Sequence, residues 1–197
     1  MYQLLESIYL NNGVFRNLDY HQARMHASAM ALFGQPFTIN IQHLLSQQPV
    51  PSQGLYKTRI IYDTKILKIE FVPYTIKPVR SLKLIADNEV CYEHKLVDRA
   101  RLTELYSQRG TADDILIVKN GLITDTYYGN IIFKRNRTWH TPESYLLKGT
   151  MRQSLLDAGL IRETTISQSN YMQFESCKII NALLGLESEE IPITSVG

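Results

Sequence analysis

The sequence has little cysteine, no long apolar run and no excess of one charge. Cys91 and Cys177 are its only cysteines, and they form no CxxC pair. Two isolated thiols exclude a disulfide-stapled secreted domain, and with the five histidines they form no metal-binding pattern. The opening MYQLLESIYL carries Glu6 and no basic start, so it does not resemble a secretory signal. We therefore expect a cytoplasmic protein without a metal site.

Charge and hydropathy exclude two further classes of protein. Lys and Arg number 21 and Asp and Glu number 19, so the net charge of +2 gives no basic surface for binding nucleic acid. No window approaches the roughly 18 apolar residues that a membrane-spanning helix needs. We therefore expect no nucleic-acid partner and no membrane partner, and instead a small-molecule substrate. The phosphate-binding GxxxxGK[ST], the dinucleotide-binding GxGxxG and the hydrolase motifs HExxH and GxSxG are also absent.

Apolar spacing and turn residues predict a mixed fold. Residues 18–33 carry apolar side chains three and four apart, with Asn17 as N-cap and Gly34 as the stop, and predict a helix. The other expected elements are helices over 95–107 and 150–158, the latter closed by Gly159; strands over 56–62, 65–72, 81–86, 178–186 and 189–196; and three antiparallel strands from 114 to 141 with a hairpin turn at Asn120-Gly121.

The two prolines of PYTIKPV mark the best candidate for a linker. They divide the chain into a small N-terminal α/β domain at 1–74, a linker at 75–79 and a larger domain at 80–197. The order of the elements predicts the α+β or α/β class.

Four segments carry groups that chemistry could use, although each also has an ordinary interpretation. Lys95 would ordinarily be a surface lysine, and Arg59 an outward-facing strand residue. Asp125 would ordinarily be a strand-end carboxylate that bonds its own backbone. Gly149-Thr150 opens the 150–158 helix and is either a plain N-cap or an anion site.

Taken together, these four segments supply the groups that pyridoxal 5'-phosphate requires. A lysine amine condenses with its aldehyde. A carboxylate keeps its pyridine nitrogen protonated. An arginine and a helix N-terminus bind its phosphate.

Five segments, in this order along the chain, resemble the class IV aminotransferases, the fold-type IV group of pyridoxal-phosphate enzymes. Within this group the chain is most similar to 4-amino-4-deoxychorismate lyases and short bacterial relatives. The segments are ESIYLNNGVFRNLDYHQARM, YKTRIIYD, HKLVDR, ITDTYYGNIIF…WHTP…LLKGTMR and INALLGLESEEIPI. The long fourth segment is the most specific of them.

The resemblance implies a D-amino acid aminotransferase-like architecture, with the cofactor between two α/β domains, and a homodimer. It also implies site residues: Lys95 as the Schiff-base lysine and proton shuttle, Arg59 at the phosphate, Asp125 at the pyridinium nitrogen, Asn130 on the ring-hydroxyl side, and the backbone N–H groups of Thr150 and Met151 at the phosphate, with the turn at Ala182 and Leu183. Two positions depart from the family pattern. Asp125 stands where Glu is usual, and Ala182 where Ser or Thr is common.

The same resemblance implies the reaction. We expect a 4-amino-4-deoxychorismate lyase, which eliminates pyruvate to give 4-aminobenzoate for folate synthesis. An aminotransferase acting on a small amino acid is the alternative, since both activities use Lys95 and the same cofactor. A third hypothesis is a non-catalytic relative, which the retention of Lys95, Arg59 and Asp125 argues against.

Overall fold

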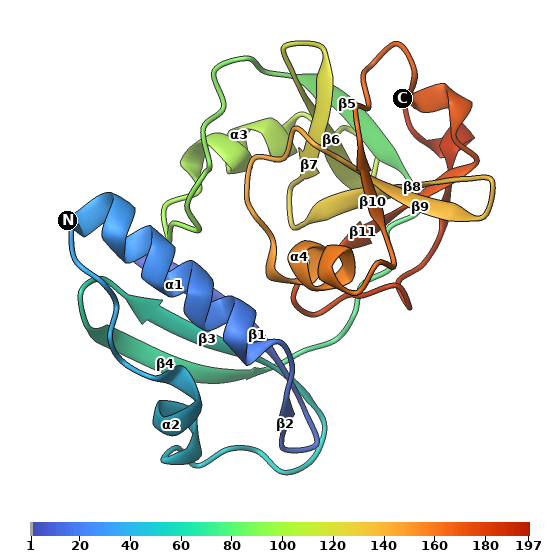
Figure 1. Cartoon of the computed structure of the whole chain (residues 1–197). Helices are drawn as coiled ribbons and strands as arrows, with labels where there is room; N and C mark the ends of the chain where they lie inside the picture. The colour runs from blue at the N-terminus through green and yellow to red at the C-terminus, as the bar shows by residue number, and fades with distance from the viewer. Residues whose placement is uncertain (1) are drawn as a thin grey trace. The chain divides into compact units, whose positions relative to one another are not determined.

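The computed structural model describes residues 2–197, with the elements labelled in Figure 1. The chain divides into two compact units. The first comprises the residues up to Ile76 together with His94–Asp98, and the second comprises Lys77–Glu93 and Arg99–Gly197. The linear domain boundaries drawn from the sequence stay a prediction, and they did not foresee that His94–Asp98 returns to the first unit. Within residues 2–197 we find no helix with the length and apolar character that crossing a bilayer requires.

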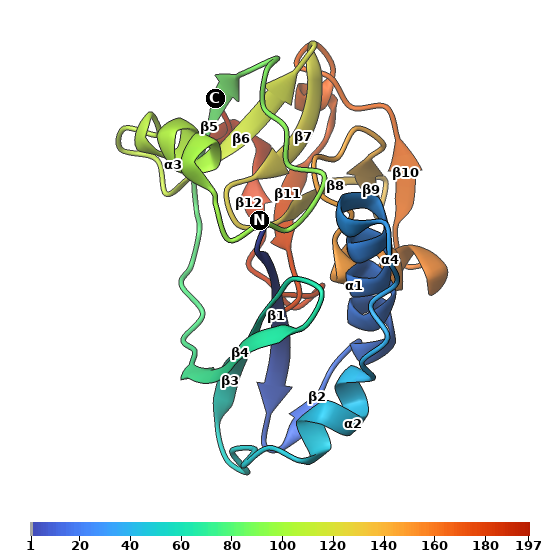
Figure 2. The same cartoon turned by 90° about the vertical axis from the view of Figure 1, so that its left-hand side faces the viewer.

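The first unit is an antiparallel sheet with helices on it, in the strand order β2-β1-β3-β4. Figure 2 shows β1 within this sheet, with β3 and β4 to one side and β2 to the other. Apolar residues of α1, α2 and the strands form its core. The elements are β1 (Leu4–Asn11), β2 (Val14–Phe15), α1 (Leu18–Phe33), α2 (Ile41–Ser46), β3 (Leu55–Tyr62) and β4 (Ile66–Pro73).

Most elements predicted for the first unit are confirmed. The helix spans 18–33, and Gly34 ends it in the left-handed conformation with φ 68°. The strands predicted over 56–62 and 65–72 pair as the antiparallel β3 and β4. Asn17 is the N-cap residue, as predicted, but it takes a left-handed conformation and its side chain makes no capping hydrogen bond. The sequence analysis did not predict β1 or α2.

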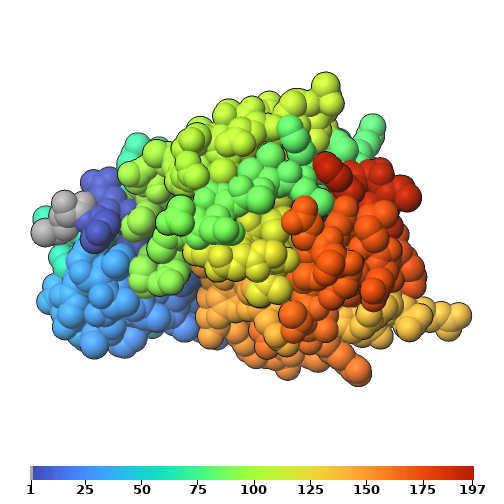
Figure 3. Space-filling view, turned by 90° about the horizontal axis from the view of Figure 1, so that it is seen from above, coloured from blue at the N-terminus to red at the C-terminus, as the bar shows by residue number. Residues whose placement is uncertain are grey.

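The second unit is a larger mixed sheet, whose main path is β10-β9-β8-β7-β6-β5, while β11 pairs with β8 and β12. The β5–β6 and β9–β10 pairs are parallel and the others antiparallel. The surface of this unit includes α3, whose residues form part of the face seen in Figure 3. The elements are β5 (Leu82–Ala86), α3 (Ala100–Ser107), β6 (Asp114–Lys119), β7 (Leu122–Thr126), β8 (Asn130–Arg135), β9 (Thr138–Pro142), α4 (Thr150–Asp157), β10 (Arg162–Thr164), β11 (Ser176–Ile180) and β12 (Ile191–Pro192), with short 3-10 helices at Tyr171–Gln173 and Ile193–Ser195.

Three predictions for the C-terminal part are corrected. The helix predicted over 95–107 begins only at Ala100, because the residues around Leu96 pair with the N-terminal end of β1. Four strands, not three, lie between 114 and 142, because a turn between β7 and β8 divides the second predicted strand. The run 189–196 forms only the two-residue β12, since Pro192 has no N–H to extend a ladder.

Of the remaining predictions for this part, the hairpin and the helix agree with the structure, and one strand differs in its bounds. The Asn120-Gly121 hairpin is present, with positive φ at both residues. The helix α4 ends at Asp157, and Gly159 follows with φ 68°. The strand predicted over 178–186 is shorter, since β11 ends at Ile180. Met151 of α4 packs in a buried cluster with side chains of β8 and β11, so the start of this helix is held against the sheet.

Candidate functional site

The eight predicted site residues fall in two sets, one in each unit. Arg59 and Lys95 belong to the first unit. The other six belong to the second unit: Asp125, Asn130, Thr150, Met151, Ala182 and Leu183. Each set is described within its own unit.

Asp125 and Asn130 form a buried polar pair in the second unit. Asp125 lies near the end of β7 and pairs with Asn130, the first residue of β8. Asn130 Nδ2 donates to Asp125 Oδ1 at 2.8 Å and to the carbonyl of Leu147 at 2.9 Å. Asp125 Oδ2 accepts hydrogen bonds from the backbone N–H groups of Leu147 at 2.9 Å and Leu146 at 3.2 Å. The carboxylate is therefore fixed by three N–H donors.

The electrostatics of Asp125 favour a cationic ligand. Burial raises the pKa of Asp125 to about 6, although the hydrogen bonds from Leu147, Asn130 and Leu146 and the charge of Arg152 act in the opposite direction. An ionised carboxylate offers about four acceptor positions, and three are used. One position remains for a further donor, and a positively charged one would offset the cost of burial. Asp125 is thus suited to hold a protonated ring nitrogen.

The N-terminus of α4 lies against the same pair. Gly149 is the N-cap residue, and a Cβ at this position would overlap Asn130 Oδ1. No side chain can therefore cap the helix from Gly149, and its first turn contains no acidic residue. The first N–H groups of a helix have no acceptor within it, and together with the helix dipole they favour an anion. Thr150 and Met151 open this helix, and both are 4% exposed.

The turn that follows β11 is the third part of this set. Asn130 pairs with Ile180, the last residue of β11, and a Cβ on Gly129 would overlap the Ile180 carbonyl oxygen. Asn181 Oδ1 accepts hydrogen bonds from the N–H groups of Leu183 at 2.8 Å and Leu184 at 3.1 Å. The predicted Leu183 donor therefore already has an acceptor, and a phosphate would have to share or replace it. Asn130 adjoins all three parts of the set.

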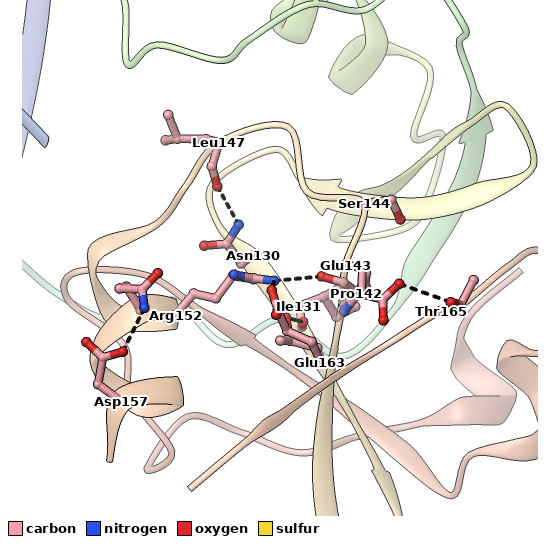
Figure 4. A network of polar contacts seen from close by, with 12 residues as sticks. Asn130, Ile131, Pro142, Glu143, Ser144, Leu147, Arg152, Asp157, Glu163 and Thr165 are labelled. Carbon is pink, nitrogen blue, oxygen red and sulfur yellow. Dashed lines mark hydrogen bonds and ion pairs between the residues drawn. The ribbon is translucent and has the colours of Figure 1, made fainter. Parts of the chain in front are cut away.

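The sequence analysis gave no role to Arg152, which organises this region (Figure 4). Its side chain is buried, and Nη2 donates to the Pro142 carbonyl at 3.0 Å and to Glu163 Oε1 at 2.5 Å. The guanidinium also lies over the ring of Tyr145, 4.4 Å from its centroid. Arg152 thereby holds both ends of the segment that leads into Leu146 and its backbone donor to Asp125. In the sequence, Arg152 could have been found from its place in the segment LLKGTMR. The backbone donors to Asp125 could not, because a backbone N–H does not depend on the residue type.

In the first unit, Arg59 lies on β3 with its side chain 32% exposed. Arg59 Nη1 donates to Glu70 Oε2 at 2.9 Å, and Glu70 also binds Lys68 at 2.8 Å. The hydrogen bond from Lys68 and the charges of Lys68 and Arg59 lower the pKa of Glu70. An anion that binds Arg59 would compete with this exposed ion pair, which costs little to break.

Lys95 is half-buried in the short segment that returns to the first unit. Its carbonyl accepts a hydrogen bond from Leu5 N–H at 2.8 Å, and Val97 N–H donates to the Gln3 carbonyl at 2.9 Å. Lys95 is therefore neither in the predicted helix nor in an unsupported loop. Its backbone is bound to the edge of β1.

A hollow of about 250 Å³ lies in the second unit. It is lined by residues of the 90–93 segment, the β6–β7 hairpin and the 144–146 segment. None of the eight predicted residues lines it, although Leu146 borders it and also donates to Asp125. Among residues 2–197, no group of three or more His, Cys, Asp or Glu side chains is placed to hold a metal ion.

Comparisons with known proteins show what this chain is similar to. An uncharacterized protein of Haemophilus influenzae is 38% identical over 189 residues, which cover 94% of this chain and all of that protein. A solved structure of a candidate 4-amino-4-deoxychorismate lyase from Haemophilus somnus is 30% identical, covers 94% of this chain and 98% of that one, and has a TM-score of 0.89. The structure of an aminotransferase from Brucella abortus bound to pyridoxal phosphate is 19% identical, covers 98% of this chain and 81% of that one, and shares the fold with a TM-score of 0.76.

The fold-type IV class implied by the resemblance is confirmed by these structures. The family model for amino-transferase class IV matches residues 63–196, about two thirds of the sequence. The chain therefore belongs to the class IV aminotransferase family.

Proposed function

We propose that the chain is a pyridoxal-phosphate-dependent enzyme that converts 4-amino-4-deoxychorismate to 4-aminobenzoate and pyruvate. The observation that carries the cofactor assignment is the buried Asp125 carboxylate, which three N–H donors hold in a pair with Asn130, whose side chain lies against Gly149 at the start of α4. The choice of reaction is supported by the similarity to the candidate lyase of Haemophilus somnus, which extends over nearly the whole of both chains.

The residues of the second unit fit the cofactor in charge and shape. Asp125 would bind the protonated ring nitrogen, and Asn130 would support the ring-hydroxyl side. The N–H groups of Thr150 and Met151 would bind the phosphate at the N-terminus of α4, because the N-cap residue Gly149 has no side chain to cap the helix. The turn at Ala182 and Leu183 would adjoin the phosphate, and Arg59 would supply a guanidinium to it.

Bound pyridoxal phosphate supplies an aldehyde that takes up the substrate amine and a protonated ring that accepts electrons from the neighbouring carbon. Lys95 would hold the cofactor covalently until the substrate amine replaces it. Its freed amine would then take the proton from the carbon that carries the substrate amino group. Asp125 would keep the ring nitrogen protonated during this step.

The proposed reaction is a redox-neutral elimination. The C–H bond at the amino-bearing carbon and the neighbouring C–O bond to the enolpyruvyl group both break, and the ring becomes aromatic. A proton delivered to the methylene carbon of the leaving group gives pyruvate. Lys95 is the residue that we expect to carry this proton.

A product assay tests the proposal. The purified chain with added pyridoxal phosphate is expected to release equal amounts of 4-aminobenzoate and pyruvate, and Lys95→Ala to release neither. Lys65→Ala, which alters an exposed lysine in the β3–β4 turn, is expected to retain the activity of the wild type. Transfer of the amino group to an added 2-oxo acid, without pyruvate release, would instead establish the aminotransferase alternative. If neither assay shows turnover, the result would favour the third hypothesis, a non-catalytic relative.

We also propose that the active form is a homodimer, as the family resemblance implies. Sedimentation equilibrium at micromolar concentration should then give twice the 22.7 kDa mass of the chain. A species of single-chain mass that retains full activity would contradict this assignment.

A further inference from the structure

A buried ionic cluster in the first unit has no part in the proposed site. Glu6 lies on the inner face of β1, and its side chain is 0% exposed. His21 Nδ1 of α1 lies 2.5 Å from Glu6 Oε2. Arg24, also of α1, donates to both oxygens of Glu6, from Nη2 at 2.5 Å and from Nε at 2.9 Å. An ionised carboxylate that is buried this deeply destabilises the fold unless it is paired, and His21 and Arg24 provide the pairing.

The cluster has a defined charge state. Burial raises the pKa of Glu6, but the charge of Arg24 and the hydrogen bond from His21 outweigh it and lower the pKa to about 2. Burial lowers the pKa of His21, the hydrogen bond and charge of Glu6 oppose this shift, and the charges of Arg24 and Lys95 add to it, so that the pKa stays below its usual value. At neutral pH we therefore assign a neutral His21 that donates from Nδ1 to an ionised Glu6. The charges of Glu6 and Arg24 then balance.

The segment that carries Lys95 is attached to the same strand. Leu5, the neighbour of Glu6 on β1, donates its N–H to the Lys95 carbonyl at 2.8 Å. Val97 donates its N–H to the Gln3 carbonyl at 2.9 Å. The end of β1 that bears Glu6 thus holds the backbone from the Lys95 carbonyl to Val97, directly after the Lys95 side chain.

The segment is also attached to the same helix. His94 Nδ1 lies 3.2 Å from Ser28 Oγ, and Ser28 is 4% exposed. Ser28 follows His21 by seven positions and Arg24 by four, so the three side chains share one face of α1. The polar face of α1 therefore binds Glu6 at one end and the residue before Lys95 at the other.

We propose that Glu6, His21 and Arg24 are positioning residues for Lys95, whose segment they hold through β1 and α1 and beside which they place a balanced pair of charges. The catalytic role of Lys95 rests on the proposed function. The placement of the Lys95 segment and its electrostatic coupling to the cluster do not. The ionisable groups that face this region are Glu6 from β1, His21 and Arg24 from α1, and Tyr62 from β3. Burial raises the pKa of Tyr62, so its hydroxyl stays neutral.

Competitive labelling of the full chain with trace acetic anhydride, without added cofactor, tests the proposal. The pH midpoint of Lys95 labelling is read by mass spectrometry in the wild type, Glu6→Gln and Arg24→Gln. Glu6→Gln leaves the Arg24 cation unbalanced and should move the midpoint down. Arg24→Gln leaves the Glu6 anion unbalanced and should move it up. Each shift should be about half a pH unit or more. The midpoint of the exposed Lys65 should stay unchanged.

Opposite shifts support the positioning role. Shifts in the same direction, or none, overturn it, because a cluster that only stabilises the core would affect both variants alike. Since no cofactor is present, this result does not depend on the lyase assay.

If either charge variant fails to fold, Ser28→Ala provides the second test. It removes the contacts of the Ser28 hydroxyl with His94 and Tyr62 and leaves the pairing of Glu6 with His21 and Arg24 in place. The Leu5 and Val97 amides should then exchange with deuterium at least about tenfold faster, while the amides of β3 that pair with β4 exchange unchanged. Equal exchange in variant and wild type would overturn the proposal.

Discussion

Among single residues, the cofactor assignment depends most on Asp125. Burial raises its pKa from 3.8 to about 6, so the folded chain binds this proton more tightly than the unfolded chain does. The resulting stability is complete below pH 4 and is lost as the pH rises through 6. We expect the free energy of unfolding of Asp125→Asn, relative to the wild type, to rise by about 3 kcal/mol between pH 4 and pH 8. Urea unfolding of the cofactor-free proteins at both pH values measures this change.

Asp113 provides the control of opposite sign. Hydrogen bonds from the backbone of Arg80 and from Ser81 lower its pKa, so its contribution to stability is present at neutral pH and is lost in acid. Asp113→Asn should therefore lose stability relative to the wild type as the pH rises from 2 to 6. If the difference between Asp125→Asn and the wild type is the same at pH 4 and pH 8, then Asp125 is not the buried carboxylate described here.

The elements of the second unit leave no space for a side chain at Gly149, the N-cap residue of α4. Gly149 has an ordinary φ of −70°, so a side chain there would be excluded by contact with Asn130 and not by backbone strain. Gly149→Ala should displace the Asn130 amide, destabilise the fold by about 1–3 kcal/mol and weaken cofactor binding at least about tenfold. Fluorescence titration with pyridoxal phosphate and thermal unfolding measure the two effects. The neighbouring exposed Lys148→Ala should change the stability little, and an equal loss in both variants would contradict this account.

Arg152 connects α4 to the segment that donates to Asp125. Arg152→Met removes a cation whose charge lowers the pKa of Asp125, so that pKa should rise further. Cofactor affinity should then fall about three- to tenfold at pH 6.5 and much less at pH 8.5, where Asp125 is ionised in either protein. Binding titrations at both pH values measure the change.

Glu163→Gln is the matched variant for Arg152. It weakens the 2.5 Å ion pair but leaves the Arg152 charge and its hydrogen bond to Pro142 in place. Its cofactor affinity should show the pH dependence of the wild type. A loss in Arg152→Met that is equal at both pH values would indicate a packing defect instead of a change in charge.

The elements that the sequence predicted well are those specified by local signals. The spacing in 18–33 and the stop at Gly34 gave α1 its observed bounds, and Asn120-Gly121 gave the hairpin. The helix over 95–107 began too early, because pairing of Leu96 with β1 depends on residues ninety positions away. The turn before Asn130 was missed, because its tyrosines suit a strand and only its contact with Ile180 requires Gly129.

The candidate site likewise contains residues that the sequence predicted and groups that it could not predict. The family motifs gave Asp125, Asn130 and the start of α4, which the structure brings together. The backbone donors of Leu146 and Leu147 could not be predicted, because any residue type carries an N–H. The return of Lys95 to the first unit likewise depends on hydrogen bonds between distant backbone groups.

For the whole molecule, the proposed function requires residues of each unit to hold one ligand, and a ligand-stability experiment tests this requirement. At about a hundred times its dissociation constant, pyridoxal phosphate should stabilise the wild type by about 2.7 kcal/mol. For a chain of this size, that corresponds to a rise of roughly 5–10 °C in Tm. Lys95→Ala and Asp125→Asn, which alter different units, should each lose most of this rise, and Lys65→Ala should keep it. A full rise in either site variant would show that its unit takes no part in holding the cofactor.

Reductive fixation is the most direct test of the covalent bond that we propose between Lys95 and the cofactor. The protein is mixed with pyridoxal phosphate and reduced with borohydride, and its peptides are then mapped by mass spectrometry. We predict one modified peptide, with the cofactor fixed to Lys95. Modification only at another lysine, or no fixed cofactor, would contradict the account.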